Sequence, residues 1–129
     1  IDYLRRIAPA NVGFTGWVTD KDLRMLLCRA KVYVQVSVHE GFGCSVAEAM
    51  LSECIPVVSR RAALPEVVGD CGFYVDERTP EAVSVAVKQA LEAPAEMGKK
   101  ARQRIIGKFP LERRGAALLR VMTEMASRR

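Results

Sequence analysis

The chain has 129 residues, a formal charge of +5 at pH 7 and hydrophobic side chains at 50% of its positions. These values fit one folded domain that buries roughly two-thirds of the surface of its unfolded chain. No apolar run approaches the length of a membrane span, and no signal-peptide pattern is present. Four cysteines without a CxxC pair and a single histidine argue against a zinc site and favour free, mostly buried thiols in a reducing cytosol.

The first thirty residues predict two helices separated by a short strand. A helix over residues 2–8 stops at Pro9, and a strand follows at Val12–Phe14. Thr19 is the predicted N-cap of the second helix. The buried face of this helix is predicted to carry Leu23, Leu26 and Leu27.

Asp20, Lys21 and Asp22 also match the DxD pattern of a metal site. Acidic residues are expected in the first turn of a helix because they complement its dipole, and Thr19 and Asp22 have the spacing of a capping box. We therefore assign these residues to a helix start and predict no metal and no other cofactor.

The central stretch, residues 31–59, predicts a strand, a glycine turn, a helix and a second strand. The first strand covers residues 32–36, and the second covers Ile55–Val58. A strand–helix–strand unit places its strands in parallel in one sheet, and such sheets bind ligands beyond the carboxyl ends of the strands. We therefore expect the functional site between Glu40 and Glu48.

The glycine turn has the chemistry of an anion site. Gly41 and Gly43 permit backbone conformations that are closed to other residues. The free N–H groups at the helix start, around Cys44, point into the crevice with the positive end of the helix dipole behind them, which suits a phosphate. Glu40 and Glu48 flank this position, and their carboxylates suit hydroxyl groups. A phosphate-linked sugar or ribose is the predicted ligand.

The remainder predicts a short helix after Pro65 with Glu66 in its first turn, a strand at Gly72–Asp76 and then three amphipathic helices. Thr79 is the predicted N-cap of the first of these helices, and Pro80 its first residue. Their apolar stripes are predicted at Val83, Val87, Ala90 and Leu91, at Met97, Ala101 and Ile105, and at Leu111, Leu118, Met122 and Met125. We expect one domain over residues 1–129, with a sheet part at residues 1–78 and a helical part at residues 79–129.

The basic excess lies in the last two helices. Residues 99–129 contain ten Lys or Arg and two Glu, whereas the other residues carry more acidic than basic side chains. A solvated helix face is the preferred interpretation, with Lys99, Lys100, Arg102 and Arg104 opposite the apolar stripe. Contact with an anionic membrane surface is the alternative, and nucleic acid is the weakest reading. No nucleic-acid partner is predicted.

The segment Glu40–Met50, EGFGCSVAEAM, resembles the glutamate–seven residues–glutamate motif of retaining glycosyltransferases of the two-Rossmann-domain (GT-B) type, in family 4 or group 1. The resemblance continues through Pro56–Ser59 and Leu64–Asp70 and ends at the strand Gly72–Asp76. It implies an α/β fold, a three-layer α/β/α Rossmann-like parallel sheet truncated at its N-terminus, with C-terminal helices. Two glycine-containing segments of the family are replaced here, by Glu53-Cys54-Ile55 and by Ala62-Ala63.

The resemblance also implies residue roles. In that family the first glutamate and the turn amides hold the donor sugar and diphosphate, while the second glutamate binds the ribose. The first set of roles falls on Glu40, Gly41, Phe42, Gly43 and Cys44. Glu40 is then the catalytic residue and Glu48 the ribose ligand. The family's loop against the nucleobase corresponds to the segment around Val18, which is the predicted base contact.

The implied activity is transfer of a hexosyl group from a nucleoside-diphosphate sugar to an acceptor hydroxyl with retention. The chain begins at Ile1, downstream of the family's first strands and basic diphosphate residue. We therefore expect the donor-binding half of a cytoplasmic enzyme that is inactive without an N-terminal acceptor domain, with peripheral contact to a membrane surface as the alternative for its basic helices. Two alternatives stay open: an epimerase-like enzyme of the same fold, or a non-catalytic binding module that uses the basic helical tail.

Overall fold

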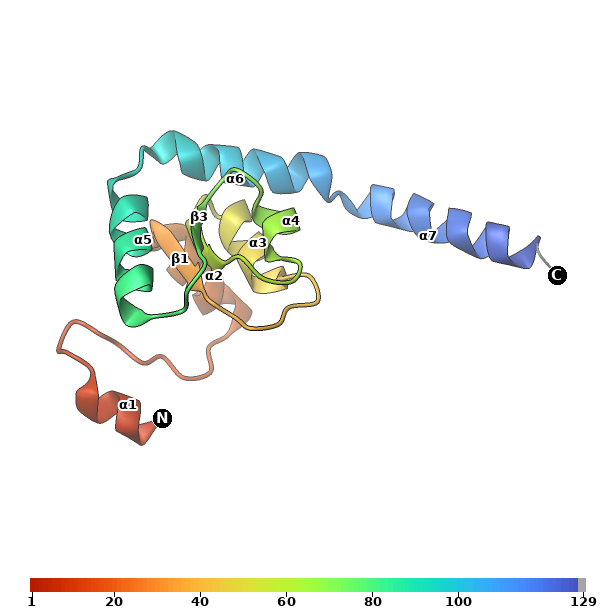
Figure 1. Ribbon diagram of the computed structural model, residues 1–129. Helices are drawn as coiled ribbons and strands as arrows, with labels where there is room; N and C mark the ends of the chain where they lie inside the picture. The colour runs from red at the N-terminus through yellow and green to blue at the C-terminus, as the bar shows by residue number, and fades with distance from the viewer. Residues whose placement is uncertain (128–129) are drawn as a thin grey trace.

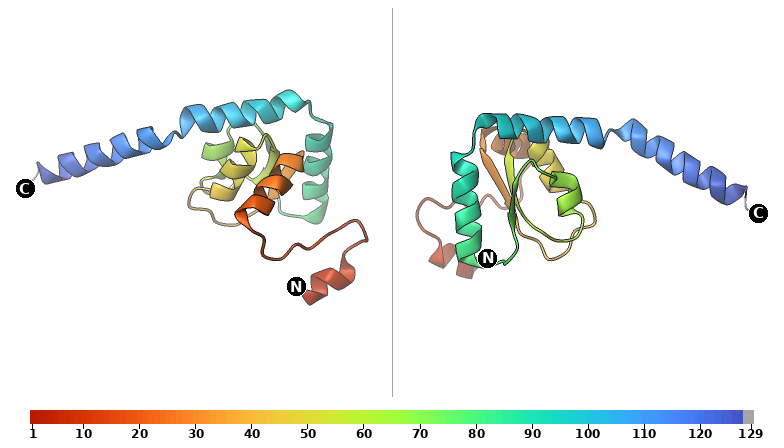
Figure 2. Two further views of the ribbon diagram at one scale, coloured as in Figure 1. Left: turned by 180° about the vertical axis from the view of Figure 1, so that it is seen from behind. Right: turned by 45° about the horizontal axis from the view of Figure 1, so that its top comes forward.

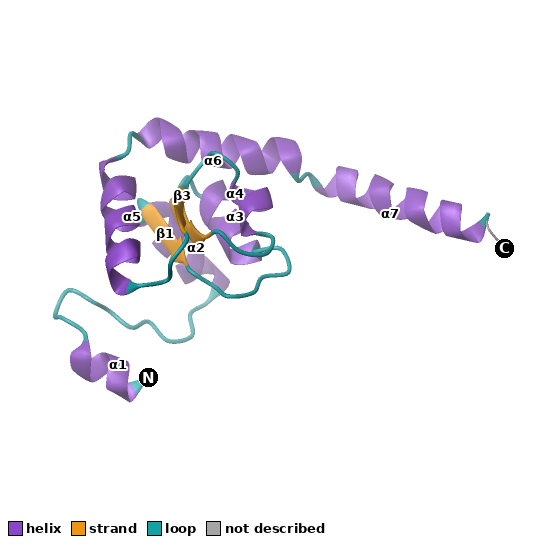
Figure 3. Ribbon diagram, viewed as in Figure 1, coloured by secondary structure: helices purple, strands orange, loops and turns teal. Residues whose placement is uncertain are grey.

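The computed structural model describes residues 1–127, so Arg128 and Arg129 of the predicted helical part lie outside the described residues. Three strands and seven helices follow one another along this part of the chain (Figures 1 and 3). In order they are α1 (Asp2–Ile7), α2 (Asp20–Arg29), β1 (Val32–Gln35), α3 (Cys44–Leu51), β2 (Ile55–Ser59), α4 (Leu64–Val68), β3 (Phe73–Val75), α5 (Pro80–Glu92), α6 (Ala95–Lys108) and α7 (Leu111–Ala126).

The three strands form one parallel sheet in the order β1-β2-β3. Val34 pairs with Val57 between β1 and β2, and Val58 pairs with Tyr74 between β2 and β3. Because all three strands are parallel, their carboxyl ends meet at one edge, and the loops that follow them lie together there. The predicted parallel βαβ unit and the third strand are confirmed.

Helices cover both faces of this sheet (Figure 2). On one face, α3, α4 and α6 enclose a core that includes Met50, Val58 and Leu64. On the other face, α5 covers a second core that includes Ile55, Val57 and Val75. Alternate residues of each strand point to opposite faces, so each strand contributes to both cores. This is the three-layer α/β/α arrangement that the sequence predicts.

The predicted helix starts at Thr19 and Thr79 are confirmed. The Thr19 side chain accepts a hydrogen bond from the Asp22 backbone N–H, and Thr79 accepts one from that of Ala82. Thr19 also donates to the Asp22 carboxylate at 2.7 Å. Asp22 therefore acts in helix capping in this structure.

Several predicted buried positions are exposed instead. On α2 only Leu27 is buried, and Leu23 and Leu26 face solvent because the helix meets the other elements at one end. On α5 the small residues Ala86 and Ala90 are buried, whereas Leu91 is exposed. All four thiols are free, but only Cys54 and Cys71 are buried, so the expectation of mostly buried thiols was wrong.

The segment before α2 is an open loop, and the predicted strand at Val12–Phe14 does not form. Val12 and Phe14 are exposed, and the sheet described here ends at β1, so no neighbouring strand supplies hydrogen bonds to this segment. Helix α1 forms as predicted and lies apart from the layered body (Figures 1 and 2).

The last two helices behave differently from each other. Helix α6 packs through Gly98, Ala101 and Ile105, next to the half-buried Met97, as the sequence predicts. Helix α7 projects from the body and has no buried residue (Figure 1). Its predicted apolar stripe, Leu111, Leu118, Met122 and Met125, is exposed and is not covered by the layered body.

Two basic side chains of α6 bind carbonyl oxygens; Arg102 stays exposed as predicted, whereas Arg104 is half-buried. Arg102 donates to the carbonyl oxygen of Leu51 at the end of α3. Arg104 donates to the carbonyl oxygens of Val67 and Glu66 in α4, at 2.8 and 2.7 Å. Both guanidinium groups satisfy carbonyls that a helix end leaves without partners.

Candidate functional site

The glycine turn is built around Gly43. This residue is the N-cap of α3 with φ +90°, and a Cβ on it would lie 3.0 Å from Cδ2 of Leu64. Both the left-handed backbone and the close leucine require glycine. Gly41 has no positive φ and has open space around it, so the expectation of a special backbone at Gly41 was wrong.

The start of α3 has free backbone donors. Its first helical hydrogen bond runs from the N–H of Ala47 to the carbonyl oxygen of Gly43 at 3.0 Å. Gly43 has no side chain, and no side-chain cap serves the N–H groups of Cys44, Ser45 and Val46. Cys44 and Ser45 are exposed. The positive end of the helix dipole is thus accessible to an anion at the carboxyl edge of the sheet.

Glu40 is held at the start of this turn by two donors. Its Oε1 accepts hydrogen bonds from Nε2 of Gln35 and from Oγ of Ser37, the latter at 3.1 Å. The carbonyl oxygen of Ser37 in turn accepts a bond of 2.6 Å from the buried Ser59 hydroxyl at the end of β2. The glutamate is therefore fixed by both strand ends.

Glu48 lies one turn inside α3 and is exposed. The charge of Glu48 acts on Tyr33 of β1. Burial raises the pKa of Tyr33, and the charges of Glu48 and Glu40 raise it further, whereas hydrogen bonding with Ser45 lowers it. The charges of both glutamates thus act on one tyrosine of β1, and the flanking of an anion site by these carboxylates stays a prediction.

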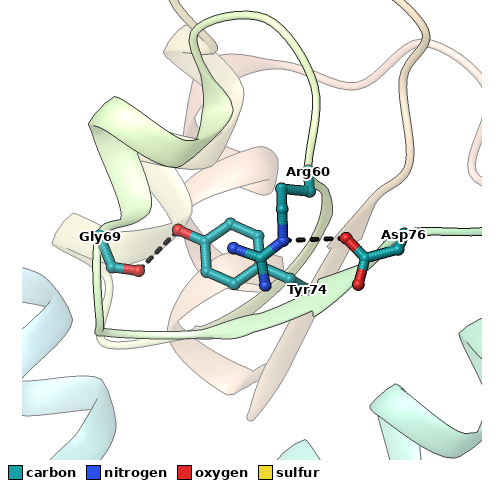
Figure 4. A network of polar contacts seen from close by, with 4 residues as sticks. All are labelled: Arg60, Gly69, Tyr74 and Asp76. Atoms are coloured by element: carbon teal, nitrogen blue, oxygen red, sulfur yellow. Dashed lines mark hydrogen bonds and ion pairs between the residues drawn. The ribbon is translucent and has the colours of Figure 1, made fainter.

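A second polar cluster occupies the ends of β2 and β3 (Figure 4). Arg60 donates to the Asp76 carboxylate at 2.9 Å, and its guanidinium lies 4.2 Å from the ring centroid of Tyr74. The Tyr74 hydroxyl donates to the carbonyl oxygen of Gly69 at 2.6 Å. Burial raises the pKa of Tyr74, although Arg60 and Arg104 act in the opposite direction. Arg60 is thus already paired.

Phe42 connects the turn to the joint between α6 and α7. Its ring packs edge-on against Phe109, with centroids 5.3 Å apart at 80°. A hollow of about 740 Å³ adjoins this pair and is lined by residues of the turn, of α4 and of the joint. They include Phe42, Cys44, Glu66, Lys108, Arg113 and Arg114. Glu40 and Glu48 do not line this hollow, so it adjoins the turn on one side only.

Val18, the predicted base contact, is half-buried and directly precedes the N-cap of α2. Helix α2 runs antiparallel to β1, the strand that follows it. The start of α2 therefore lies at the edge of the sheet where the strands have their carboxyl ends. The loop that carries Val18 and the loop before α3 lie on the same side of the sheet in Figures 1 and 2. The structure places Glu40, Gly43, Cys44 and Glu48 along the turn and the first turns of α3, and Val18 in the loop before α2.

Sequence reasoning missed the residues beneath the turn. Tyr33 and Gln35 were read only as members of an apolar strand, and Ser59 only as a strand end. The available signal was the spacing of two polar side chains, at i and i+2, within a run of valines. Such a pair shares one face of a strand, and a buried glutamine needs partners there.

The replaced glycines have a visible consequence. Glu53 and Ala62, in the two segments where the resembled family has glycine, take positive φ angles of 65° and 50°. The backbone thus keeps the left-handed conformation that glycine would adopt more easily, at a cost in conformational energy.

Comparisons with known proteins agree with this architecture. The chain is similar to sucrose-phosphate synthase from Thermosynechococcus elongatus, with a TM-score of 0.85, 22% identity and coverage of 99% of this chain and 34% of that one. At this identity the likeness establishes the fold, a Rossmann-like half of the GT-B type.

No helix of residues 1–127 is long and apolar enough to cross a membrane.

Among curated proteins, a GDP-mannose-dependent alpha-(1-6)-phosphatidylinositol dimannoside mannosyltransferase of Mycobacterium tuberculosis is 31% identical over 124 residues, which are 95% of this chain and 32% of that protein. The O-antigen chain mannosyltransferase B of Escherichia coli is 38% identical over 81 residues, 63% of this chain and 21% of that protein. The chain spans between about a fifth and a third of these relatives. Residues 2–93 match the family model described as Glycosyl transferases group 1. The chain therefore belongs to the group 1 family of glycosyl transferases.

Proposed function

We propose that this chain is the donor-binding half of a retaining mannosyltransferase and that its donor is GDP-mannose. One observation carries the proposal: Gly43 turns the chain so that the uncapped start of α3 lies between Glu40 and Glu48. The choice of donor is supported by the relatives, which are named as mannosyltransferases, one of them GDP-mannose-dependent.

In the proposed complex the diphosphate lies at the start of α3. When the bond between the sugar carbon and the diphosphate oxygen breaks, negative charge develops on the departing diphosphate. The N–H groups of Cys44 and Ser45 stabilise that charge without needing to reorient. Glu40 orients the mannose, Glu48 binds the ribose hydroxyls, and Val18 contacts the guanine. The oxygen of an acceptor hydroxyl then bonds to the same face of the sugar carbon, and the hydroxyl proton passes to the departing diphosphate.

Acceptor binding is assigned to a further domain of a longer protein, so residues 1–129 alone bind the donor without transferring sugar. The proposed reaction uses the helix start rather than a metal to stabilise the diphosphate. A cytoplasmic location and contact between the basic helices and an anionic membrane surface stay predictions.

Binding is tested by titrating the protein with GDP, UDP and ADP while recording backbone amide NMR shifts. We expect GDP to shift the amides of Gly43, Cys44, Ser45 and Glu48, and UDP and ADP to shift them less at equal concentration. Equal shifts with all three nucleotides would contradict the choice of guanine. Absence of shifts in a folded sample would contradict the donor site in this chain.

The two glutamates are separated by comparing GDP with GDP-mannose. Glu48→Ala should weaken both ligands by about tenfold, because a lost hydrogen bond to a charged group commonly has that effect. Glu40→Ala should weaken only GDP-mannose. Glu92→Ala, an exposed glutamate at the far end of α5, is the matched control and should change neither. Equal loss of GDP affinity in both site variants would refute the proposed division of roles.

A further inference from the structure

A continuous set of hydrogen bonds runs beneath the glycine turn. The Tyr33 hydroxyl and Oε1 of Gln35 are 3.0 Å apart, and Nε2 of Gln35 contacts Oε1 of Glu40. Tyr33 and Gln35 are two residues apart on β1, so their side chains share one face of the sheet, the face that α3 covers.

The direction of each hydrogen bond follows from chemistry. An ionised carboxylate only accepts, so the Gln35 group that faces Glu40 must be the NH₂ group. The amide oxygen then faces Tyr33, and the Tyr33 hydroxyl must donate to it. The Glu40 carboxylate therefore fixes the orientation of the Gln35 amide, and the Tyr33 hydroxyl, which can donate or accept, completes the set by donating.

The far end of this set lies near the start of α3. Ser45, in the first turn of α3, is close enough to the Tyr33 phenol to act against the rise of its pKa. Glu40 precedes the turn and Ser45 follows it. Hydrogen bonds therefore join Tyr33, Gln35 and Glu40 beneath the turn, and Ser45 lies near the tyrosine end of this set. We call these four residues the strap.

We propose that Gln35 and Tyr33 are positioning residues that hold Glu40 and the start of α3 in a fixed relation to each other, and so set the sugar selectivity of the donor site. The proposal deepens the proposed function and rests on it, because Glu40 is taken to face the sugar. Oε1 of Glu40 accepts hydrogen bonds from Gln35 and Ser37, and these bonds determine where the other carboxylate oxygen points.

Ligand affinities can distinguish a positioning role of the strap from a purely structural role. If it only filled the space between β1 and α3, its loss would lower the stability of the whole sheet and weaken every ligand equally. If it positions Glu40, its loss should weaken GDP-mannose and leave GDP nearly unchanged, because the bare nucleotide does not reach Glu40.

The test compares three variants. Gln35→Leu removes the donor to Glu40 and should weaken GDP-mannose on the order of tenfold, as expected for a hydrogen bond to a charged group, while GDP changes by less than about twofold. Gln35→Glu has nearly the same size but places a second carboxylate against Glu40, so its loss should be larger. Tyr33→Phe keeps the ring and frees the Gln35 amide, so its loss should be smaller than that of Gln35→Leu.

Tyr74→Phe is the matched control. It also removes a buried tyrosine hydroxyl that donates a hydrogen bond, but from β3, with β2 between it and β1. We expect Tyr74→Phe to lower thermal stability to a similar extent as Tyr33→Phe. The ratio of the affinity for GDP to the affinity for GDP-mannose should stay unchanged. Equal weakening of both ligands by the strap variants, or wild-type affinities for both, would overturn the proposal.

A measurement without ligand separates this proposal from the proposed function. In the free protein, Gln35→Leu should shift the amide signals of Gly41, Gly43 and Cys44 and leave those of α5 in place. This result is expected even if the chain binds no nucleotide. Unchanged turn amides in Gln35→Leu would overturn the strap, whatever the ligand titrations show.

Discussion

Helices α6 and α7 follow one another, have 14 and 16 residues, and both carry apolar side chains beside basic ones. Only α6 is buried against the layered body. The residues it buries are small or medium in size, Gly98, Ala101 and Ile105, whereas α7 exposes larger ones such as Leu118, Met122 and Met125. Apolar spacing alone predicted both helices, but it did not predict which one would be covered.

The difference lies in how closely each helix approaches another backbone. A Cβ on Gly98 would lie 2.1 Å from the carbonyl oxygen of Glu53, so α6 touches the turn between α3 and β2. Arg102 and Arg104 then bind carbonyls at the ends of α3 and α4. Gly115 of α7 has open space around it. Arg113 of α7 donates only to the carbonyl oxygen of Lys108 at the end of α6, at 3.4 Å. Close backbone contact and binding to carbonyls of the layered body therefore distinguish the buried helix.

The largest effect is expected from a pair of glycine substitutions. Gly98→Ala should destabilise the fold by about 3 kcal/mol, because the new methyl group overlaps a backbone oxygen that cannot move freely. Gly115→Ala should instead stabilise α7 by about 0.5 to 1 kcal/mol, since alanine is the better helix former. Urea denaturation followed by circular dichroism measures both. Equal effects in the two variants would remove the distinction between the helices.

A smaller effect is expected from two arginines. Arg104→Ala should cost about 1 to 3 kcal/mol, because two carbonyl oxygens of α4 lose a charged donor. Arg120 of α7 has only an exposed ion pair with Glu124 at 3.9 Å, so Arg120→Ala should change the free energy of unfolding by less than about 1 kcal/mol. Arg104→Lys should restore only part of the loss, because lysine lacks the planar group that bonds two carbonyls. Full restoration would assign the effect to charge alone.

The sequence predicted the layers and the glycine turn well because both depend on local patterns. Apolar strands, Thr19 and Thr79 as caps, and a glycine before α3 each leave a short-range signal. The buried carbonyl contacts of Arg104 and the link from Tyr33 to Glu40 join residues from different elements, so no local pattern reports them. The prediction of a strand at Val12–Phe14 was wrong for the same reason. A strand needs a neighbouring strand to pair with, and the spacing of apolar residues does not show whether one is present.

The smallest expected effect is on pH dependence, and it should arise in the layered body rather than in α7. Burial raises the pKa values of the Tyr33 and Tyr74 phenols and of the Cys54 and Cys71 thiols above their ordinary values of 10.0 and 9.0. The folded protein therefore holds these protons more tightly than the unfolded chain does. Their contribution to stability is complete below the ordinary values and is lost as the pH rises through the raised ones.

Urea midpoints in the presence of a reducing agent should therefore begin to fall above pH 9.0 and continue to fall above pH 10.0. Circular dichroism is the suitable probe, because Trp17 is 90% exposed in a loop and its fluorescence would report little of the core. The double variant Tyr33→Phe/Tyr74→Phe should show a smaller fall than the wild type, since two of the ionising groups are gone. A fall of the same size in the double variant would assign the alkaline loss to the thiols, and a flat profile in the wild type would contradict the raised pKa values altogether.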